Sequence, residues 1–157
     1  MNTMNTLKEG QKAPDFELLN TEGKKTKLSQ FKGKRVVLYF YPKDDTSGCT
    51  KQACDFRDHI GEITKLGAVV IGVSNDDLAS HQKFTQKYNL NFMLLSDTEK
   101  KVVNLYGVYG PKQMMGRTYE GIHRTTFIID ETGKIIKVFE KVSAQESLQE
   151  VMEVLKK

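Results

Sequence analysis

The feature that most constrains the fold is a nearly unbroken apolar run over residues 35–41, RVVLYFY. Because it does not alternate polar and apolar side chains, it predicts a central strand that is covered on both faces. A second run, AVVIGVS over residues 68–74, predicts another buried strand. We expect a helix between them over residues 48–65, with Gly67 just past its end. A strand, a helix and a strand in this order form a crossover that makes the two strands parallel.

The remaining segments continue this mixture of strands and helices. Ser74, Asn75 and Asp76 are candidates for the N-cap of a second helix. In chain order we expect hairpin strands at 16–19 and 25–28, the second helix ending near residue 88, a strand at 92–96, a helix at 98–106, an irregular stretch at 107–122, strands at 125–129 and 135–139, and a closing helix at 144–156. This order predicts an α/β fold with a mixed central sheet, helices on both faces and an N-terminal β-hairpin. We expect residues 1–157 to form one domain.

Cys49 lies just past the carboxyl end of the first buried strand, where sheets of this kind tend to carry their chemistry. Pro42 ends the strand, and Ser47 is a plausible N-cap for the helix that follows. Cys49 then occupies the first turn, where free N–H groups and the helix dipole stabilise an anion. A thiolate is such an anion, and it is the nucleophilic form of cysteine.

Helical periodicity separates this cysteine from the second one. Cys49 shares its face of the helix with four apolar residues: Ala53, Phe56, Ile60 and Ile63. That face should pack on the sheet and restrict access to the thiol. Cys54 lies on a more polar flank. In a reducing compartment, two such cysteines are packing residues, metal ligands or redox-active thiols.

Charge and hydropathy exclude several classes of function. The net charge is +4 and the lysine pairs are scattered, so we expect no nucleic-acid binding. No stretch approaches the roughly 18 consecutive apolar residues of a membrane span. The polar N-terminus lacks the basic start and apolar run of a secretory signal. We therefore expect a cytoplasmic protein without a membrane partner.

Other chemistry-bearing residues form no recognisable site. His59, His81 and His123 are isolated in sequence, and with two cysteines they give no metal-ligand spacing. Neither a P-loop nor a dinucleotide glycine pattern is present. Asp44 and Asp45 would disfavour a nearby thiolate, so we expect both side chains to point into solvent.

A short pattern after the first buried strand reads Pro42-x-x-x-Thr46-x-x-Cys49. It belongs to the longer run FYPKDDTSGCT over residues 40–50, and Cys54 follows five residues after the first cysteine. This arrangement resembles the active-site signature of the peroxiredoxins. The longer run is similar to their bacterioferritin-comigratory-protein or PrxQ branch.

The resemblance extends over nearly the whole chain. Residues 10–16 and 119–130 are also similar to this branch. Ser47 is a departure, because the branch usually has proline there. The change removes some stiffness from the loop and touches no side chain with a chemical role.

The resemblance implies a thioredoxin-like fold and a peroxidase that acts on hydrogen peroxide and organic hydroperoxides. It makes Cys49 the peroxidatic thiol, and Thr46 a hydrogen-bonding partner of the substrate or thiolate. Pro42 would shield the thiolate from water, and Arg124 would stabilise both the thiolate and the developing charge. No metal or organic cofactor is required, because sulfur itself is the nucleophile. The branch is often monomeric, so we expect a monomer.

Cys54 is the remaining cysteine, and the resemblance implies that it resolves the sulfenic acid on Cys49. The product is an intramolecular disulfide, which a thioredoxin-type dithiol would reduce. In an intact helix, Cα atoms five residues apart are roughly 8–9 Å apart, whereas a disulfide requires about 4.4–6.8 Å. The sequence therefore predicts a helix from about residue 49 in the reduced protein, and local unwinding over residues 49–54 in the oxidised protein.

Two alternative functions remain at this level. A redox sensor or binding module of thioredoxin-like fold would use the same cysteines to switch a partner without turnover. A general disulfide reductase is disfavoured, because such enzymes use Cys-x-x-Cys, whereas four residues separate Cys49 from Cys54.

Overall fold

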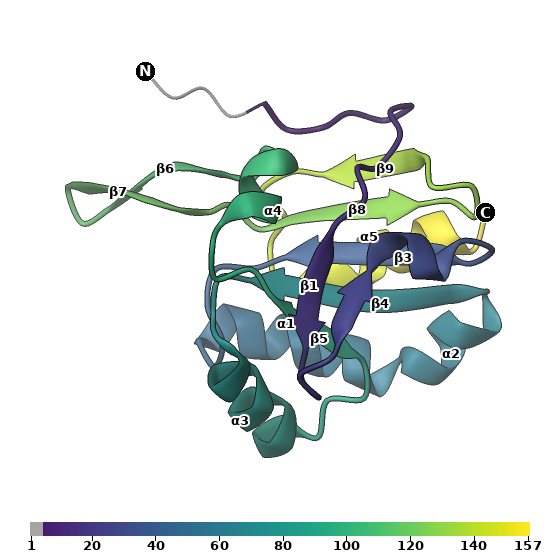
Figure 1. The fold of residues 1–157 in the computed structure, drawn as a ribbon, viewed down its shortest axis with the longest axis horizontal. Coiled ribbons are helices and arrows are strands. Elements are labelled where there is room, and N and C mark those ends of the chain that lie inside the picture. The colour runs from purple at the N-terminus through teal and green to yellow at the C-terminus, as the bar shows by residue number, and fades with distance from the viewer. Residues whose placement is uncertain (1–4) are drawn as a thin grey trace.

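The strand β3 (Arg35–Phe40) lies inside the sheet, as its apolar sequence predicts. The computed structural model describes residues 5–157 and contains a seven-stranded sheet of order β2-β1-β5-β4-β3-β8-β9 (Figure 1). Every residue of β3 after Arg35 is buried. A separate two-stranded sheet is formed by β6 and β7.

Outside residues 28–31, 59–65 and 107–122, the elements follow the predicted order of strands and helices. Their bounds are β1 (Glu17–Asn20), β2 (Lys25–Lys27), the 3-10 turn η1 (Leu28–Phe31), β3, α1 (Ser47–Asp58), α2 (Ile60–Lys65), β4 (Ala68–Ser74), α3 (Leu78–Tyr88), β5 (Met93–Ser96), α4 (Lys101–Leu105), β6 (Tyr109–Met114), β7 (Arg117–Ile122), β8 (Thr125–Ile129), β9 (Ile135–Phe139) and α5 (Ser147–Leu155).

The large sheet is mixed. β3 runs parallel to β4 and antiparallel to β8, and β4 runs parallel to β5. The hairpin of β1 and β2 joins the sheet through antiparallel pairing of β1 with β5. The predicted α/β fold, with its mixed sheet, flanking helices and N-terminal hairpin, is confirmed.

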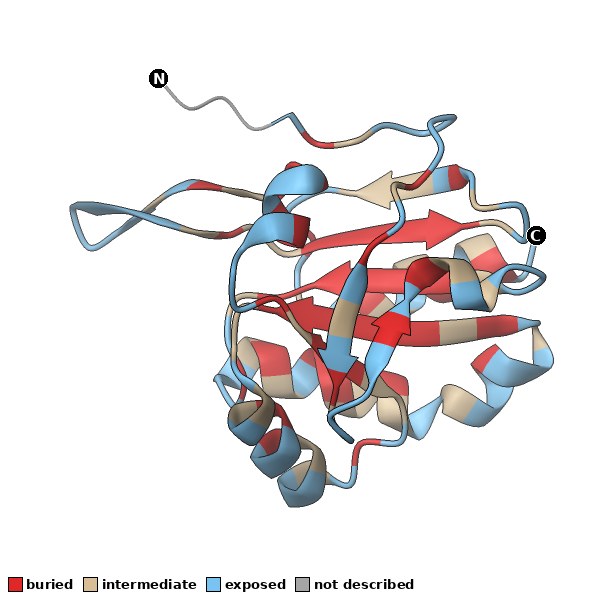
Figure 2. Ribbon diagram, in the orientation of Figure 1, coloured by how far each residue is buried: buried red, intermediate tan, exposed pale blue. Residues whose placement is uncertain are grey.

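Two apolar cores lie on opposite faces of this sheet. Successive side chains of a strand point to opposite faces, so β3 contributes to both. Val37 and Tyr39 pack with apolar residues of α1, α2, α3 and α5. Leu38 and Phe40 pack with residues of α4 and η1. Figure 2 shows the result as buried central strands between helices whose outer surfaces are exposed.

Helix boundaries differ from the prediction. The single helix expected over residues 48–65 is interrupted at His59, whose φ of −119° and ψ of 12° leave the helical region. The His59 N–H donates to Phe56 O at 3.1 Å, which closes a tight turn between α1 and α2. The helices expected at 98–106 and 144–156 are shorter at both ends, as α4 and α5.

The N-cap of α3 is Asp77 rather than one of the predicted residues Ser74, Asn75 and Asp76. Asp77 Oδ1 accepts a hydrogen bond from the Ser80 N–H at 2.9 Å. The helix therefore begins slightly later than the sequence suggested, because its cap competes with other polar residues in the same short loop.

The prediction of an irregular stretch over residues 107–122 is wrong, because β6 and β7 form a hairpin there. Met115 and Gly116 have φ of 53° and 79°, as a two-residue type I′ turn requires. The usual Asn-Gly or Asp-Gly signal of such a turn is missing, and the exposed strands show little apolar alternation. The hairpin projects from one side of the body, at the left in Figure 1.

Gly72 of β4 is required by close packing against its neighbours in the sheet. A Cβ atom there would lie 2.8 Å from both Leu94 Cδ2 and Tyr39 Cζ. We expect Gly72→Ala to lower the free energy of unfolding by about 1–3 kcal/mol, as overpacking does. Gly61→Ala in α2 is the matched control, because no atom lies within 4 Å of its added Cβ. It should raise stability by roughly 0.5–1 kcal/mol. Equal midpoints of urea unfolding for the two variants would contradict this account.

Candidate active site

Cys49 lies in the first turn of α1 and is 1% exposed. The N-cap of α1 is Thr46, one residue before the predicted Ser47. Thr46 O accepts the first helical hydrogen bond, from the Thr50 N–H at 2.8 Å. The thiol therefore lies beside free N–H groups at the positive end of the helix, where an anion is stabilised.

The apolar face of α1 seats the thiol against the sheet. Ala53 and Phe56 are fully buried and belong to the same cluster as Cys49, Tyr39 and Tyr41. The predicted inner face of the helix is therefore confirmed for these residues. The sulfur is therefore almost closed off from solvent.

Arg124 is in direct contact with this thiol. Its Nη2 donates a hydrogen bond to Cys49 Sγ at 3.3 Å. The contact follows from strand pairing, because Phe40 at the end of β3 is opposite Thr125 at the start of β8. Arg124 directly precedes β8, so the antiparallel register delivers its guanidinium to the loop and helix that follow β3. A permanent cation therefore lies within hydrogen-bonding distance of the sulfur.

Gln52 positions this arginine, and sequence reasoning missed it. Its Oε1 accepts a hydrogen bond from Arg124 Nη1 at 2.6 Å, and its Nε2 donates to Ser147 Oγ at 2.9 Å. Gln52 and Ser147 are each 1% exposed. The available signal was an amide three residues after Cys49, on the same apolar helix face as Ala53 and Phe56. Such a buried amide requires polar partners.

Thr46 and Pro42 lie in the loop between β3 and α1. The Thr46 hydroxyl donates to Lys43 O at 2.9 Å, which leaves its lone pairs available to accept. Thr46 is exposed, whereas Pro42 is partly buried directly after β3. Of the predicted site residues, Arg124 is thus in contact with Cys49. Thr46 and Pro42 lie in the loop that precedes the helix of Cys49.

Cys54 lies further along α1 and is partly exposed, as its place on the polar flank predicted. Both cysteines are free, and both belong to one continuous helix. The expectation of a helix that includes residue 49 in the reduced protein agrees with this arrangement.

A second cation, Lys112, lies close to the site. It comes from β6, the strand that sequence reasoning did not find. Its Nζ donates to Ile122 O at 2.8 Å. Burial lowers the pKa of Lys112, and the charge of Arg124 lowers it further. The hairpin therefore brings positive charge toward the same side of the molecule as the thiol.

A hollow of about 420 Å³ opens beside the start of α1. Its lining residues are Ser47, Gly48, Lys51, Ser143, Ala144 and Gln145. A Cβ atom at Gly48 would lie 3.1 Å from Arg124 Nη2, so this glycine leaves room for the guanidinium. Another cavity, of about 410 Å³, includes Val36 and Ile129 at the opposite end of β3 and β8. It is therefore not part of this site.

Two predictions about neighbouring residues are wrong. Asp44 was expected in solvent but is 7% exposed, and its Oδ2 lies 2.6 Å from His81 Nδ1. His81 was interpreted as isolated but is fully buried in this contact. The neighbouring Asp45 is exposed, as predicted.

No histidine serves Cys49 as a base among the described residues, because all three bond elsewhere. Their partners are Asp55 O for His59, Asp44 and Leu95 O for His81, and Pro111 O for His123. The fold and the site therefore define a class: an α/β protein with a buried cysteine in the first turn of a helix, in hydrogen-bonding contact with an arginine.

The chain belongs to the AhpC/TSA family, whose model matches residues 9–138. It is similar to the putative peroxiredoxin bcp of Coxiella burnetii, with 51% identity over 94% of this chain and 97% of the relative. It is also similar to the peroxiredoxin Bcp of Bacillus subtilis, with 48% identity over 96% of each. The resemblance to the peroxiredoxins of this branch is thus confirmed.

Solved structures of related proteins have the same fold. The bacterioferritin comigratory protein of Xanthomonas campestris, described for its alkyl peroxide reduction activity, superposes with a TM-score of 0.85 and 34% identity, over 90% of each chain. PrxQ of Xylella fastidiosa gives a TM-score of 0.87 and 31% identity, over 99% of this chain and 96% of the other. These neighbours confirm the thioredoxin-like fold.

The contact between Arg124 and Cys49 predicts how fast the thiol reacts with an alkylating agent. A hydrogen bond to a charged group contributes about 1.5–3 kcal/mol, so Arg124→Gln should slow alkylation by iodoacetamide near neutral pH by roughly 10-fold or more. Gln52→Ala should slow it less, because the guanidinium remains but loses its support. Lys51→Ala, an exposed neighbour on α1, is the control and should react like the wild type. An unchanged rate in Arg124→Gln would show that the guanidinium does not stabilise the thiolate.

Proposed function

We propose that this protein is a thiol peroxidase that reduces hydroperoxides through Cys49. The observation that carries the proposal is the hydrogen bond from Arg124 Nη2 to Cys49 Sγ at a helix N-terminus. Two independent sources of positive potential meet at one buried sulfur, which is the arrangement that a thiolate nucleophile requires.

In the first step the Cys49 thiolate attacks the terminal oxygen of a hydroperoxide. The O–O bond breaks, sulfur is oxidised to a sulfenic acid, and the alkoxide or hydroxide takes up a proton and leaves as an alcohol or water. Negative charge spreads over sulfur and both oxygens during the transfer. The Arg124 guanidinium, fixed by Gln52, stabilises that charge without having to reorganise.

The loop residues bind and shelter the substrate in this proposal. The Thr46 hydroxyl already donates to Lys43 O, so it accepts a hydrogen bond from the O–H of the incoming hydroperoxide. Pro42 supplies an apolar wall with no N–H of its own and limits the water around the thiolate.

Cys54 resolves the sulfenic acid in the second step. Its thiol attacks the sulfenic sulfur of Cys49, a disulfide forms and water leaves. Both residues lie in α1, where helix geometry holds Cα atoms five residues apart at roughly 8–9 Å. The first turns of α1 must therefore unwind before the bond forms.

The relatives support the remaining features of the proposal. The Xanthomonas protein is described for alkyl peroxide reduction, which supports organic hydroperoxides as substrates alongside hydrogen peroxide. A thioredoxin-type dithiol would return the disulfide to two thiols. Within residues 5–157, no helix is long and apolar enough to cross a membrane. A cytoplasmic monomer with one domain over residues 1–157 completes the proposal.

The redox-sensor alternative receives no comparable support. The curated relatives at 48–51% identity are named peroxiredoxins. A peroxidase turns over when a reductant is supplied, whereas a sensor is oxidised once per molecule. Turnover is therefore the property that separates the two functions.

Peroxide consumption with excess dithiothreitol tests the function directly. The wild type should consume many equivalents of hydrogen peroxide and Cys49→Ser should consume none, because it lacks the nucleophile. Cys54→Ser should retain turnover with this small dithiol, which can reduce the sulfenic acid itself. Stoichiometric consumption by the wild type, despite complete reduction of its thiols, would instead indicate a sensor.

Oxidation by one equivalent of peroxide tests the proposed resolution step. Mass spectrometry should find an intramolecular disulfide between Cys49 and Cys54, and a non-reducing gel should show no covalent dimer. Amide hydrogen exchange should accelerate over residues 49–54, because unwinding removes their helical hydrogen bonds. A disulfide with unchanged protection of this segment, or a disulfide between two chains, would contradict the mechanism.

A further inference from the structure

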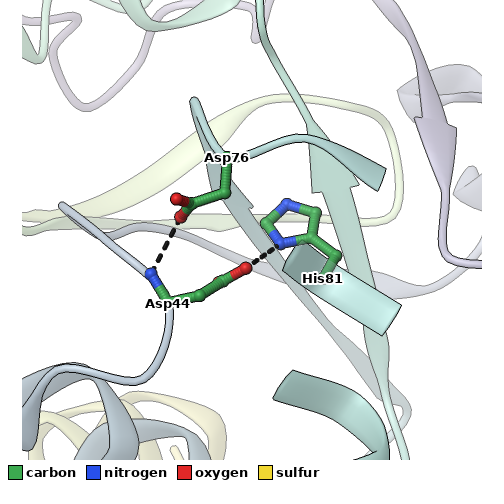
Figure 3. A group of neighbouring side chains, drawn as sticks. All are labelled: Asp44, Asp76 and His81. Carbon is green, nitrogen blue, oxygen red and sulfur yellow. Dashed lines mark hydrogen bonds and ion pairs between the residues drawn. The ribbon is translucent and has the colours of Figure 1, made fainter. Parts of the chain in front are cut away.

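One buried polar cluster lies beside the reactive loop and takes no part in the chemistry proposed above. Asp44 is in the middle of the loop between β3 and α1, and His81 is in the first turns of α3. They are 7% and 0% exposed, and Asp44 Oδ2 lies 2.6 Å from His81 Nδ1. Figure 3 shows how this contact joins the loop to the helix. Buried charged groups persist only when they are paired and hydrogen-bonded.

Both side-chain oxygens of Asp44 accept hydrogen bonds. Oδ1 accepts from the Tyr41 hydroxyl at 2.5 Å, and Oδ2 also accepts from the Ser80 hydroxyl at 2.8 Å. The Asp44 N–H donates to Asp76 Oδ2 at 2.8 Å. Ser80 and His81 belong to α3, and Asp76 lies just before it. Asp44 therefore fastens the loop to the N-terminal end of α3.

Both ring nitrogens of His81 have a hydrogen-bonding partner. Nε2 lies 3.0 Å from Leu95 O, which can only accept, so this nitrogen donates. Nδ1 lies against the Asp44 carboxyl group, which also accepts from two hydroxyl groups. Burial and Asp44 keep the pKa of Tyr41 well above its usual range, so that hydroxyl remains a donor. The His81 side chain therefore links the loop to β5 as well as to α3.

A metal site is the competing interpretation of this cluster. The ligand atoms of Asp44, Asp76 and His81 lie within 4.8 Å of one another. Each atom nevertheless has a protein partner, since Asp76 Oδ2 accepts from the Ser74 hydroxyl at 2.7 Å as well as from the Asp44 N–H. A cation would have to displace these donors. The bonds therefore favour an anchor over a cation site.

The backbone of the loop explains why an anchor is needed. Asp45 has a φ of 59°, and this left-handed region costs roughly 1–2 kcal/mol for a residue with a Cβ. Such a conformation persists only where its surroundings fix it. The bonds of Asp45 itself, to Lys87 and Tyr88, are exposed and contribute little. The buried contacts of Asp44 are the firmer restraint.

We propose that Asp44 and His81 are positioning residues whose buried hydrogen-bonded pair fixes the loop that carries Pro42 and Thr46 in its place before the start of α1. The pair fixes the loop between β3 and α1, which would bind the hydroperoxide, to α3. Unwinding of α1 therefore starts after this loop and does not extend into it. This inference rests on the proposed peroxidase function, because the loop needs a fixed place only if it binds a hydroperoxide.

Two reactions of the Cys49 thiol distinguish a residue that positions the loop from one that only stabilises the fold. Oxidation of Cys49 by hydrogen peroxide requires the loop, whereas alkylation by iodoacetamide requires only the thiolate held by Arg124 and the helix. Asp44→Asn should slow the first by about 10- to 100-fold, as small misplacements of binding groups do, and change the second by less than about 3-fold. Asp45→Asn removes the adjacent, exposed carboxylate and should leave both rates near wild type. Single-turnover kinetics on the full chain provide both rates.

The partner residue gives two independent readouts. His81→Asn should reproduce the selective loss, and the double variant with Asp44→Asn should be no slower than either single variant, because the two act as a unit. Nitrogen-15 NMR of the imidazole should give the same His81 signals in the reduced protein and in the disulfide form. A His81 signal that shifts on oxidation would contradict a fixed pair.

Three outcomes would overturn the inference. The first is that Asp44→Asn matches Asp45→Asn in both reactions, the second is that both reactions slow equally, and the third is that the double variant is slower by the product of the single effects. Urea unfolding verifies that each variant is folded. If Asp44→Asn is not, Ser80→Ala removes one bond to the carboxylate, and a selective loss of peroxide reactivity or its absence then decides. A wild type that fails to consume peroxide is a separate result, and it would refute the proposed function instead.

Discussion

The register between β3 and β8 is the constraint on which the reactive site depends. Phe40 is opposite Thr125, so Arg124 arrives beside the helix that begins after β3. A slip of one residue would turn every side chain of β8 to the other face of the sheet. Because β8 and nearly all of β3 are buried, that slip would disrupt both apolar cores. The packing of the cores thus also fixes the distance between guanidinium and sulfur.

Two sets of hydrogen bonds hold the residues of the site in place, one through Gln52 and one through Asp44. Gln52 links Arg124 to Ser147 at the start of α5, but it lies in the segment between the two cysteines. In the proposed cycle, unwinding of that segment removes both Cys49 and Gln52 from Arg124. The loop before α1 is instead bonded to α3 through Asp44. One half of the site can therefore come apart and reassemble while the other half stays in place.

The sequence predicted the sheet, the N-terminal hairpin and the position of Cys49 because each depends on local pattern. The hairpin over residues 107–122 escaped prediction, since its turn at Met115 and Gly116 uses an unusual residue pair and its strands are mostly exposed. Because Lys112 lies on this hairpin, its position relative to the thiol was not predicted either. Asp44 and Asp45 are neighbours of the same type, and no sequence pattern tells which of them is buried.

By itself the sequence determined that a cysteine opens a helix after a buried strand, with a second cysteine five residues later. Apolar runs and helical periodicity are properties of consecutive residues, so they can be interpreted without a fold. Only the tertiary structure decided which polar side chains meet across the chain. Gln52 and Arg124 are 72 residues apart, and Asp44 and His81 are 37 apart. Such pairs form because the packing of strands and helices brings their backbones together, and buried polar atoms must then find partners there.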